Sequence, residues 1–291
     1  MKQIGIIGAG IMASGMAQNF LKQGYPVRVW NRSPERLDPL VDKGAQVCET
    51  PKELTAASDI IIECVADDEG SREVWSSEHG ILAGATKDKV LITAATLSLA
   101  WVDALAGMCT QRDLSFLDMP LTGGRAGAEN GGLSLLVGGD AQVLDGIRSE
   151  LGAISVNIFH FGPVGSGMRF KLMLNTLSAI HMNAAAQAAE LARRAGIDPD
   201  VFYTALFDGK MGPASPATGI LVRDKDMPPE NVNFAIKWIE KDLRYAQAMA
   251  KAYGFNFDLL NATHDDYDRA KQDGMAERDW SAIAAAYKAD R

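Results

Sequence analysis

A lysine and an asparagine, Lys171 and Asn175, stand four residues apart in the segment GSGMRFKLMLN, residues 165–175. On a helix this spacing places both side chains on one face, with Ser178 three residues further along. The rest of that face is apolar or small, where a lysine is costly unless it is paired or employed, for example in proton transfer. A structural lysine whose amine reaches solvent is an equally good interpretation of this segment alone.

A second candidate group is the segment DMPLTGG, which ends in Thr122, Gly123 and Gly124. It follows a predicted strand, so its threonine and glycines are expected at the carboxyl end of a sheet, where open α/β sheets bind ligands. Successive glycine N–H groups can hold a carboxylate there. An ordinary Thr-Gly-Gly turn explains the segment equally well if it is considered alone.

A glycine-rich loop, GAGIMA, joins the predicted strand Ile4–Ile7 to a predicted helix. Gly8 permits the tight turn, Gly10 permits close approach of a pyrophosphate, and the small Ala13 permits close packing of helix on strand. The loop occupies the right place in a β-α-β unit, with a second strand ending at Trp30 about 20 residues later. We therefore predict a dinucleotide site rather than an unliganded glycine turn.

The second strand is followed by Asn31, Arg32 and Ser33. Sites that prefer NAD usually have Asp or Glu here to bind the ribose hydroxyls. A guanidinium instead pairs with a 2′-phosphate, and Asn and Ser add neutral hydrogen bonds. The sequence thus favours NADP(H) over NAD(H), although Arg32 is also explicable as a solvated charge and Ser33 as a helix N-cap.

The triplet Lys241-Asp242-Leu243 lies on a predicted helix. Considered alone, such a triplet is typical of an exposed charged face. It indicates a functional site only when it is taken together with the glycine loop and the segments of residues 118–124 and 165–175.

These groups must be positioned by two regions of different character. Up to about Phe161, short apolar runs alternate with helical patterns, which predicts β-α-β units and a mainly parallel, doubly wound sheet. The predicted strands are Ile4–Ile7, Val27–Trp30, Ile60–Val65, Val90–Thr93, Ser115–Asp118, Leu133–Val137 and Asn157–Phe161. The predicted helices between them are Met12–Gln23, Pro34–Lys43, Pro51–Ala57, Ser71–Trp75, Trp101–Arg112 and Ala141–Leu151.

After Gly162-Pro163 only helical patterns follow. The predicted helices are Gly167–Ala195, Pro199–Phe207, Ala214–Lys225, Asn233–Tyr253, Leu259–Asp273 and Trp280–Ala289. The predicted fold class is therefore α/β: an N-terminal doubly wound Rossmann domain over residues 1–162, then an all-α C-terminal domain over residues 163–291, joined by the long helix.

Composition excludes several classes of protein. The 291 residues carry 29 basic and 37 acidic side chains, a net charge of −8, which makes nucleic acid a poor partner. No stretch approaches the ~20 apolar residues of a membrane span. The three cysteines are widely spaced and the four histidines show no metal-ligand spacing, so we expect free thiols, no metal and a cytoplasmic location.

Taken together, the four groups resemble the β-hydroxyacid dehydrogenase family, which includes 3-hydroxyisobutyrate dehydrogenases, tartronate semialdehyde reductases and glyoxylate/succinic semialdehyde reductases. The resemblance covers essentially the whole chain. The family's glycine loop matches residues 8–13, its substrate motif D-x-P-V-S-G-G matches residues 118–124, its catalytic G-x-G-x-x-x-K-x-x-x-N matches residues 165–175, and its K-D-L triplet matches residues 241–243.

The resemblance implies a role for each matching residue. Lys171 is the expected catalytic residue. The expected substrate contacts are Thr122, Gly123, Gly124, Asn175 and Asp242, with Asp242 also bracing Lys241. The expected cofactor contacts are Gly8, Ala9, Gly10, Ile11, Met12, Asn31, Arg32, Ser33, Val65, Thr96 and Lys241.

Some residues depart from the family pattern. Thr122 replaces the usual serine and keeps its hydroxyl, and Ala13 replaces a common glycine. The family's D-x-S-T segment reads Thr93-Ala94-Ala95-Thr96 here, so only its threonine remains, which leaves the substrate pocket undetermined.

The expected function is NADP-dependent interconversion of a small carboxylated aldehyde or ketone and its hydroxyacid, hence a small anionic substrate. Two alternatives stay open: an imine or non-acid aldehyde reductase, and a non-catalytic NADP-binding sensor on the same fold. The alanine- and methionine-rich helix Gly167–Ala195 and the resemblance together predict a homodimer or homotetramer built mainly through the second half.

Overall fold

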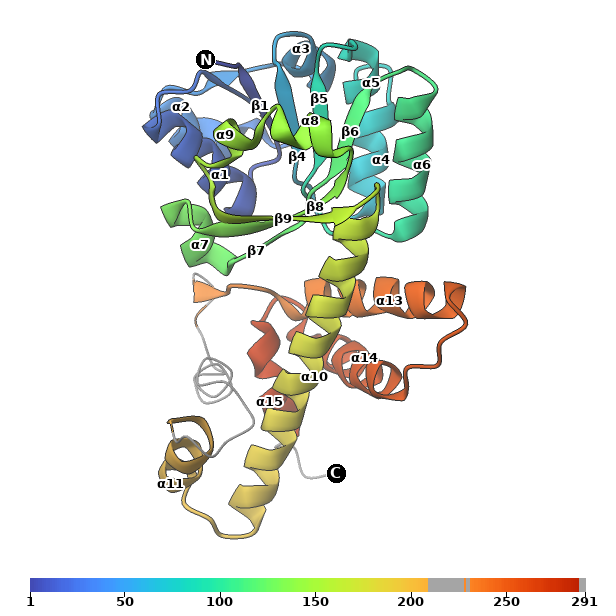
Figure 1. Cartoon of the computed structure of the whole chain (residues 1–291). Coiled ribbons are helices and arrows are strands. Elements are labelled where there is room, and N and C mark those ends of the chain that lie inside the picture. The colour runs from blue at the N-terminus through green and yellow to red at the C-terminus, as the bar shows by residue number, and fades with distance from the viewer. Residues whose placement is uncertain (209–227, 229–230, 288–291) are drawn as a thin grey trace. The chain divides into compact units, whose positions relative to one another are not determined.

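The structure is a computed structural model that describes residues 1–208, 228 and 231–287. The chain divides into two compact units, Met1–Lys171 and Leu172–Arg291. The division falls inside one continuous helix, α10 (Ser166–Arg194), which links the two units (Figure 1).

The described residues of the first unit form one nine-stranded sheet in the order β3-β2-β1-β4-β5-β6-β8-β7, with β9 paired to β8. Strands β1 to β6 are all parallel to one another. Strand β8 is antiparallel to β6 and β7 and parallel to β9. The strands are β1 (Ile4–Ile7), β2 (Val27–Trp30), β3 (Gln46–Val47), β4 (Ile60–Glu63), β5 (Val90–Thr93), β6 (Ser115–Asp118), β7 (Leu121–Thr122), β8 (Leu133–Gly139) and β9 (Ser155–Gly162). The doubly wound, mainly parallel sheet is confirmed.

Helices cover both faces of this sheet, with α1 on one side and α4 and α6 on the other (Figure 1). This cover explains why β1 and β4 are buried at every position. The helical elements are α1 (Ile11–Lys22), η1 (Pro34–Leu37), α2 (Asp38–Val41), α3 (Pro51–Ala56), α4 (Asp68–Ser76), α5 (Ile81–Gly84), α6 (Leu99–Thr110), α7 (Gly124–Asn130), α8 (Ala141–Asp145) and α9 (Arg148–Leu151).

Several predicted boundaries are wrong. Strand β4 ends at Glu63 rather than Val65, because Asp67 caps the following helix by accepting a hydrogen bond from the Gly70 N–H at 2.9 Å. The predicted helix Ala141–Leu151 is two short helices, α8 and α9, separated at Gly146. Four short elements, β3, β7, α5 and α7, were not predicted because each has too few residues to show a period.

In the second unit, every regular element of the described residues is helical. Besides the rest of α10, the elements are α11 (Pro199–Tyr203), η2 (Thr204–Asp208), α13 (Ile236–Ala252), α14 (Asp258–Ala270), η4 (Lys271–Met275), η5 (Trp280–Ala282) and α15 (Ile283–Ala286). The predicted helix Ala214–Lys225 lies outside the described residues. Among the described helices, none combines the length and apolar character needed to cross a membrane.

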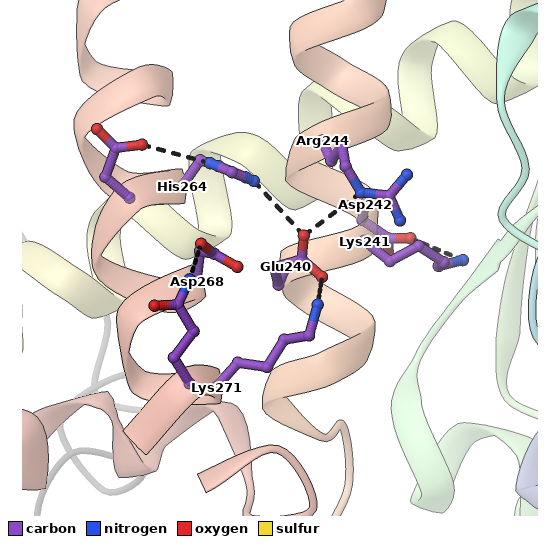
Figure 2. Close-up of polar contacts among 9 residues, drawn as sticks. Glu240, Lys241, Asp242, Arg244, His264, Asp268 and Lys271 are labelled. Atoms are coloured by element: carbon purple, nitrogen blue, oxygen red, sulfur yellow. Dashed lines mark hydrogen bonds and ion pairs between the residues drawn. The ribbon is translucent and has the colours of Figure 1, made fainter. Parts of the chain in front are cut away.

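A buried carboxylate holds α13 to the elements that follow it (Figure 2). Glu240 of α13 is 3% exposed, and its Oε2 lies 2.7 Å from Nζ of Lys271. Its Oε1 lies 3.5 Å from Nε2 of His264 on α14 and 3.4 Å from Nε of Arg244. The neighbouring His264, against the opposing effect of burial, lowers the pKa of Glu240 to about 2, and Glu240 in turn raises the pKa of His264.

This pair generates a prediction of pH-dependent stability. Because folding raises the pKa of His264 and lowers that of Glu240 from 4.5 to about 2, the pair stabilises fully between about pH 4.5 and pH 6.5. We expect His264→Ala to cost about 1–2 kcal/mol more at pH 6 than at pH 9 in urea unfolding. The control His181→Ala, at an exposed histidine, should cost the same at both. Equal costs for His264→Ala would mean that folding does not raise the pKa of His264.

The beginning of α10 packs directly on the sheet through Gly167. A Cβ atom there would overlap the Leu136 carbonyl oxygen of β8 and lie 3.0 Å from Oδ2 of Asp118. Only a glycine allows this approach of helix to strand.

Gly167→Ala should therefore destabilise the first unit by about 1–3 kcal/mol through overpacking. The matched control is Gly107→Ala in α6, where a Cβ would meet no atom within 4 Å. That substitution should stabilise the chain by about 0.5–1 kcal/mol, as expected for alanine inside a helix. Thermal unfolding of both variants checks the pair, and a Gly167→Ala variant as stable as Gly107→Ala would contradict the packing argument.

Candidate functional site

The glycine loop follows β1 and leads into α1. Gly8 has φ +115°, and a Cβ there would overlap the Cys64 carbonyl oxygen. Gly10 is the N-cap of the twelve-residue α1 and makes no side-chain capping bond, while a Cβ on Gly10 would meet nothing within 4 Å. The N-terminus of α1 thus has free space and backbone N–H groups without a side-chain cap, which fits a pyrophosphate.

The three residues after β2 lie at the surface of the same unit. Asn31 donates a hydrogen bond from Nδ2 to the Ser33 carbonyl oxygen at 2.8 Å, which shapes the turn. Ser33 occupies the N-cap position of η1, but its side chain makes no capping bond. Arg32 is 81% exposed and has a loose ion pair at 3.8 Å with Glu73, so its guanidinium can reorient toward an anion.

Val65 and Thr96 lie on the loops after β4 and β5. These strands are parallel neighbours, so both loops leave the same edge of the sheet as the glycine loop. Asp68 joins the two loops, because its carboxylate accepts hydrogen bonds from Ser98 N at 2.9 Å and Ser98 Oγ at 2.5 Å.

The segment of residues 118–124 spans β6, β7 and the beginning of α7. Thr122 is half-buried and pairs with Ser134 of β8, while Gly123 (φ +132°) and Gly124 (φ +60°) adopt positive φ. Helix α7 packs on α1, where Asn19 donates a hydrogen bond to the Ala128 carbonyl oxygen at 2.7 Å. The helix that follows the threonine-glycine loop is therefore fixed to the helix that follows the glycine loop.

Asp118 connects this segment to α10. It is fully buried, and its carboxylate accepts hydrogen bonds from the N–H groups of Gly165 at 2.6 Å and Met168 at 2.7 Å. Burial raises the pKa of Asp118, and these two backbone bonds oppose that effect. The carboxylate caps the helix that carries Lys171, a role that its position in the sequence gave no means to predict.

Lys171 and Asn175 lie one turn apart on α10, the first half-buried and the second 8% exposed. Lys171 is the last residue of the first unit, and Asn175 belongs to the second. Asn175 donates a hydrogen bond from Nδ2 to Oδ2 of Asp242 at 2.6 Å. The helix therefore carries the lysine in one unit and an amide fixed by a buried carboxylate in the other.

The Lys241-Asp242 pair is buried, so the interpretation of this triplet as an exposed charged face is wrong. Lys241 is 6% exposed and Asp242 1% exposed. Nζ of Lys241 lies 3.1 Å from Oδ1 of Asp242, a contact that Figure 2 shows, and 5.2 Å from the centre of the Tyr245 ring. The structure thus brings Asn175, Asp242 and Lys241 together within the second unit.

Sequence reasoning missed two further charged groups. Glu63, at the end of β4, is fully buried, and burial raises its pKa to about 7. Glu240 directly precedes the Lys241-Asp242 pair and is buried with it. The signal in the sequence is that each of these glutamates lies next to a predicted motif. Such a neighbour does not indicate whether the side chain is buried.

Comparisons with known proteins identify the two halves of the chain. Residues 3–162 match the family model of the NAD binding domain of 6-phosphogluconate dehydrogenase. Residues 165–287 match the model described as NAD-binding of NADP-dependent 3-hydroxyisobutyrate dehydrogenase. Both halves of the chain are thus assigned to related dehydrogenase domains.

Individual relatives are similar along nearly the whole chain. Glyoxylate/succinic semialdehyde reductase 2, chloroplastic, of Arabidopsis thaliana is 30% identical, over 98% of this chain and 79% of that protein. Cytokine-like nuclear factor N-PAC of Xenopus tropicalis is also 30% identical, but the chain spans only 53% of its length. The solved 3-hydroxyisobutyrate dehydrogenase of Mycobacterium tuberculosis with L-serine has a TM-score of 0.85 at 25% identity, covering 99% of this chain and 100% of that one.

The two family models, the reductase relative and the shared fold lead to one assignment. The chain belongs to the β-hydroxyacid dehydrogenase family of NAD(P)-dependent oxidoreductases that act on CH–OH groups.

Proposed function

We propose that the protein is an NADP(H)-preferring enzyme that interconverts a small carboxylated aldehyde or ketone and its hydroxyacid. The observation that carries the proposal is the placement of Lys171 and Asn175 one turn apart on α10. Asn175 is bound to the buried Asp242–Lys241 pair, and the helix itself is capped by the carboxylate of Asp118. A helix held at these two places gives Lys171 a defined orientation, which proton transfer requires.

The chain's own residues fit a dinucleotide. Residues 8–12 would hold the pyrophosphate, residues 31–33 the 2′-phosphate of the adenosine ribose, and Val65, Thr96 and Lys241 the remainder of the cofactor. The open space at Gly10 and the exposed, loosely paired guanidinium of Arg32 support this assignment. When bound, a nicotinamide cofactor supplies a hydride donor or acceptor.

Lys171 would exchange one proton with the substrate. In reduction, its ammonium Nζ donates a proton to the carbonyl oxygen, which becomes the hydroxyl of the product. In oxidation, the neutral amine accepts the hydroxyl proton as the carbonyl forms. Asn175 would orient the substrate or Lys171, with its own amide fixed by Asp242.

Thr122, Gly123 and Gly124 would hold the acid group of the substrate. A hydroxyl and backbone N–H groups at a turn with positive φ are donors suited to a carboxylate. Succinic semialdehyde, glyoxylate, tartronate semialdehyde and 3-hydroxyisobutyrate all fit such a group of donors.

A second candidate function is a non-catalytic NADP-binding protein. The N-PAC relative, which is named as a nuclear factor, is as similar to the chain as the reductase relative. A sensor needs only the glycine loop, whereas Lys171, Asn175 and Thr122 are all present here. NADPH consumption with carboxylated aldehydes, uncharged aldehydes and cyclic imines separates this function, and the imine reductase alternative, from the proposed one.

The proposed acid–base role generates the central prediction. Lys171→Ala should lower kcat by about 10²–10⁴-fold, the usual contribution of a general acid–base group, while NADPH binding stays nearly unchanged. Lys171→Arg should restore little activity, because a guanidinium does not deprotonate in the oxidation direction. Lys251→Ala, at an exposed lysine of α13, is the control and should keep full activity. Retention of more than about a tenth of kcat by Lys171→Ala would refute the mechanism.

The proposed coenzyme preference rests on Arg32. Arg32→Glu should raise KM for NADPH far more than KM for NADH, because the new carboxylate would repel the 2′-phosphate. Arg36→Glu makes the same charge change four residues away, at another exposed arginine, and should leave both constants near the wild-type values. If Arg32→Glu alters neither constant, another group recognises the nucleotide.

We also propose a homodimer or homotetramer assembled mainly through the second half. Several apolar side chains of α10 are exposed in the single chain: Met173 by 49%, Leu177 by 51% and Leu191 by 70%. Covering them in an interface removes apolar surface from water. Light scattering at micromolar protein should give a multiple of the 31.2 kDa chain mass, and a monomer mass at every concentration would contradict the proposal.

The proposed compartment is the cytoplasm. Cys48, Cys64 and Cys109 form no disulfide, and two of them are buried, as is usual in a reducing environment.

A further inference from the structure

Glu63 lies at the edge of the sheet from which three loops depart. It is the last residue of β4 and is fully buried. Its partners in register are Ile7 of β1 and Thr93 of β5. The next residues of these three strands begin the glycine loop, the loop with Val65 and the loop with Thr96, so Glu63 stands level with the start of all three.

The contacts of Glu63 join two of these loops. The hydroxyl of Thr93 donates a hydrogen bond to Oε2 of Glu63 at 2.6 Å. On the backbone, the Ala94 N–H donates to the Glu63 carbonyl oxygen at 2.7 Å. The carboxyl group and the backbone of Glu63 therefore both bind the strand that leads to Thr96.

A second layer of contacts closes the same two loops further out. Asp68 of α4 accepts two hydrogen bonds from Ser98, and the hydroxyl of Ser71 accepts one from the Trp101 indole at 2.9 Å. A change in the position of Glu63 or Thr93 must therefore be transmitted to the loops, because their outer ends are fixed to each other.

The surroundings of Glu63 favour its neutral form. Burial raises its pKa to about 7, against opposing contacts with Thr93, Trp75, Val65 and Ser71, all of them neutral. Strands β1 and β5 have no charged residue. On α4, Asp68 binds Ser98, Arg72 lies 4.1 Å from the Trp101 ring centre, and Glu69 and Glu73 are exposed.

We propose that the neutral carboxyl group of Glu63 is a positioning residue for the cofactor, holding the Val65 and Thr96 loops together, and that its ionisation weakens cofactor binding. A buried carboxylate without a cation beside it is stabilised by water, which reaches it only if the loops separate. The inference rests on the proposed assignment of Val65 and Thr96 to the cofactor.

The test is the dissociation constant of NADH and NADPH between pH 6 and pH 9, measured by fluorescence titration without substrate. NADH is the primary probe, because the 2′-phosphate of NADPH titrates near pH 6. The wild-type constant for NADH should rise about tenfold over this range. Glu63→Gln, which is neutral at every pH and still accepts the Thr93 hydrogen bond, should keep the low value throughout.

A substitution at the other end of β4 provides the control. Asp59 precedes β4 at its opposite end, is exposed, and accepts a hydrogen bond from the Gln3 N–H at 2.7 Å. Asp59→Asn should follow the wild-type pH profile. A wild-type profile without a rise, or a Glu63→Gln profile that rises like the wild type, would overturn the proposal.

Two further measurements separate the remaining outcomes. If Glu63→Gln does not fold, Thr93→Val is the variant to measure. Loss of the Thr93 hydroxyl removes a hydrogen bond that lowers the pKa of Glu63, so the midpoint of the rise in the NADH dissociation constant should move to higher pH. A midpoint equal to that of the wild type would count against the role of Glu63. Absence of NADH and NADPH binding in all variants would instead refute the proposed cofactor site.

The stability of the chain without cofactor is the second measurement. The free energy of unfolding of the wild type should fall from pH 4.5 to about pH 7, because the pKa of Glu63 is higher in the folded chain than in the unfolded one. Glu63→Gln should lack this fall.

Discussion

The two hydrogen bonds from Gly165 and Met168 to the buried carboxylate of Asp118 are the constraint on which the candidate site depends. They fix the N-terminus of α10 to the end of β6, next to the threonine-glycine segment. The close approach of Gly167 to β8 leaves the helix no room to shift. Lys171 follows within the next turn, so its placement relative to the sheet is determined by a carboxylate that has no part in the proposed proton transfer.

The first unit positions its loops by the same principle, with polar contacts placed where the strands end. Asn19 fixes α1 to α7, and Asp68 fixes the loop after β4 to the loop after β5. Each contact lies next to a predicted binding segment without belonging to it. The doubly wound sheet supplies the common edge, and these side chains supply the exact spacing that a rigid binding site needs.

Much of this could be predicted from the sequence. The parallel strands are apolar runs bounded by turns, and α10 has no internal proline or glycine after its first turn, so both were predicted close to their observed bounds. Motif spacing likewise placed Lys171 and Asn175 on one face of α10, whereas Asp242 was singled out only by the family resemblance. The pairing of Glu240 with His264 could not be predicted, because the two residues lie on different helices and only tertiary packing brings them together. The burial of Glu63 was equally inaccessible, since a glutamate at a strand end is most often exposed.

Glu240, Lys241 and Asp242 are consecutive residues of α13 and all three are buried, although neighbouring side chains on a helix point in different directions. Each charge is balanced by a different partner: His264 and Lys271 for the first, Asp242 for the second, Lys241 and Asn175 for the third. Replacing either Lys241 or Asp242 by a neutral residue leaves a buried charge without its counterpart, which is more harmful than replacing both members of the pair. Over evolutionary time, these positions should therefore change in pairs, and the variation at one should be readable in the variation at its partner.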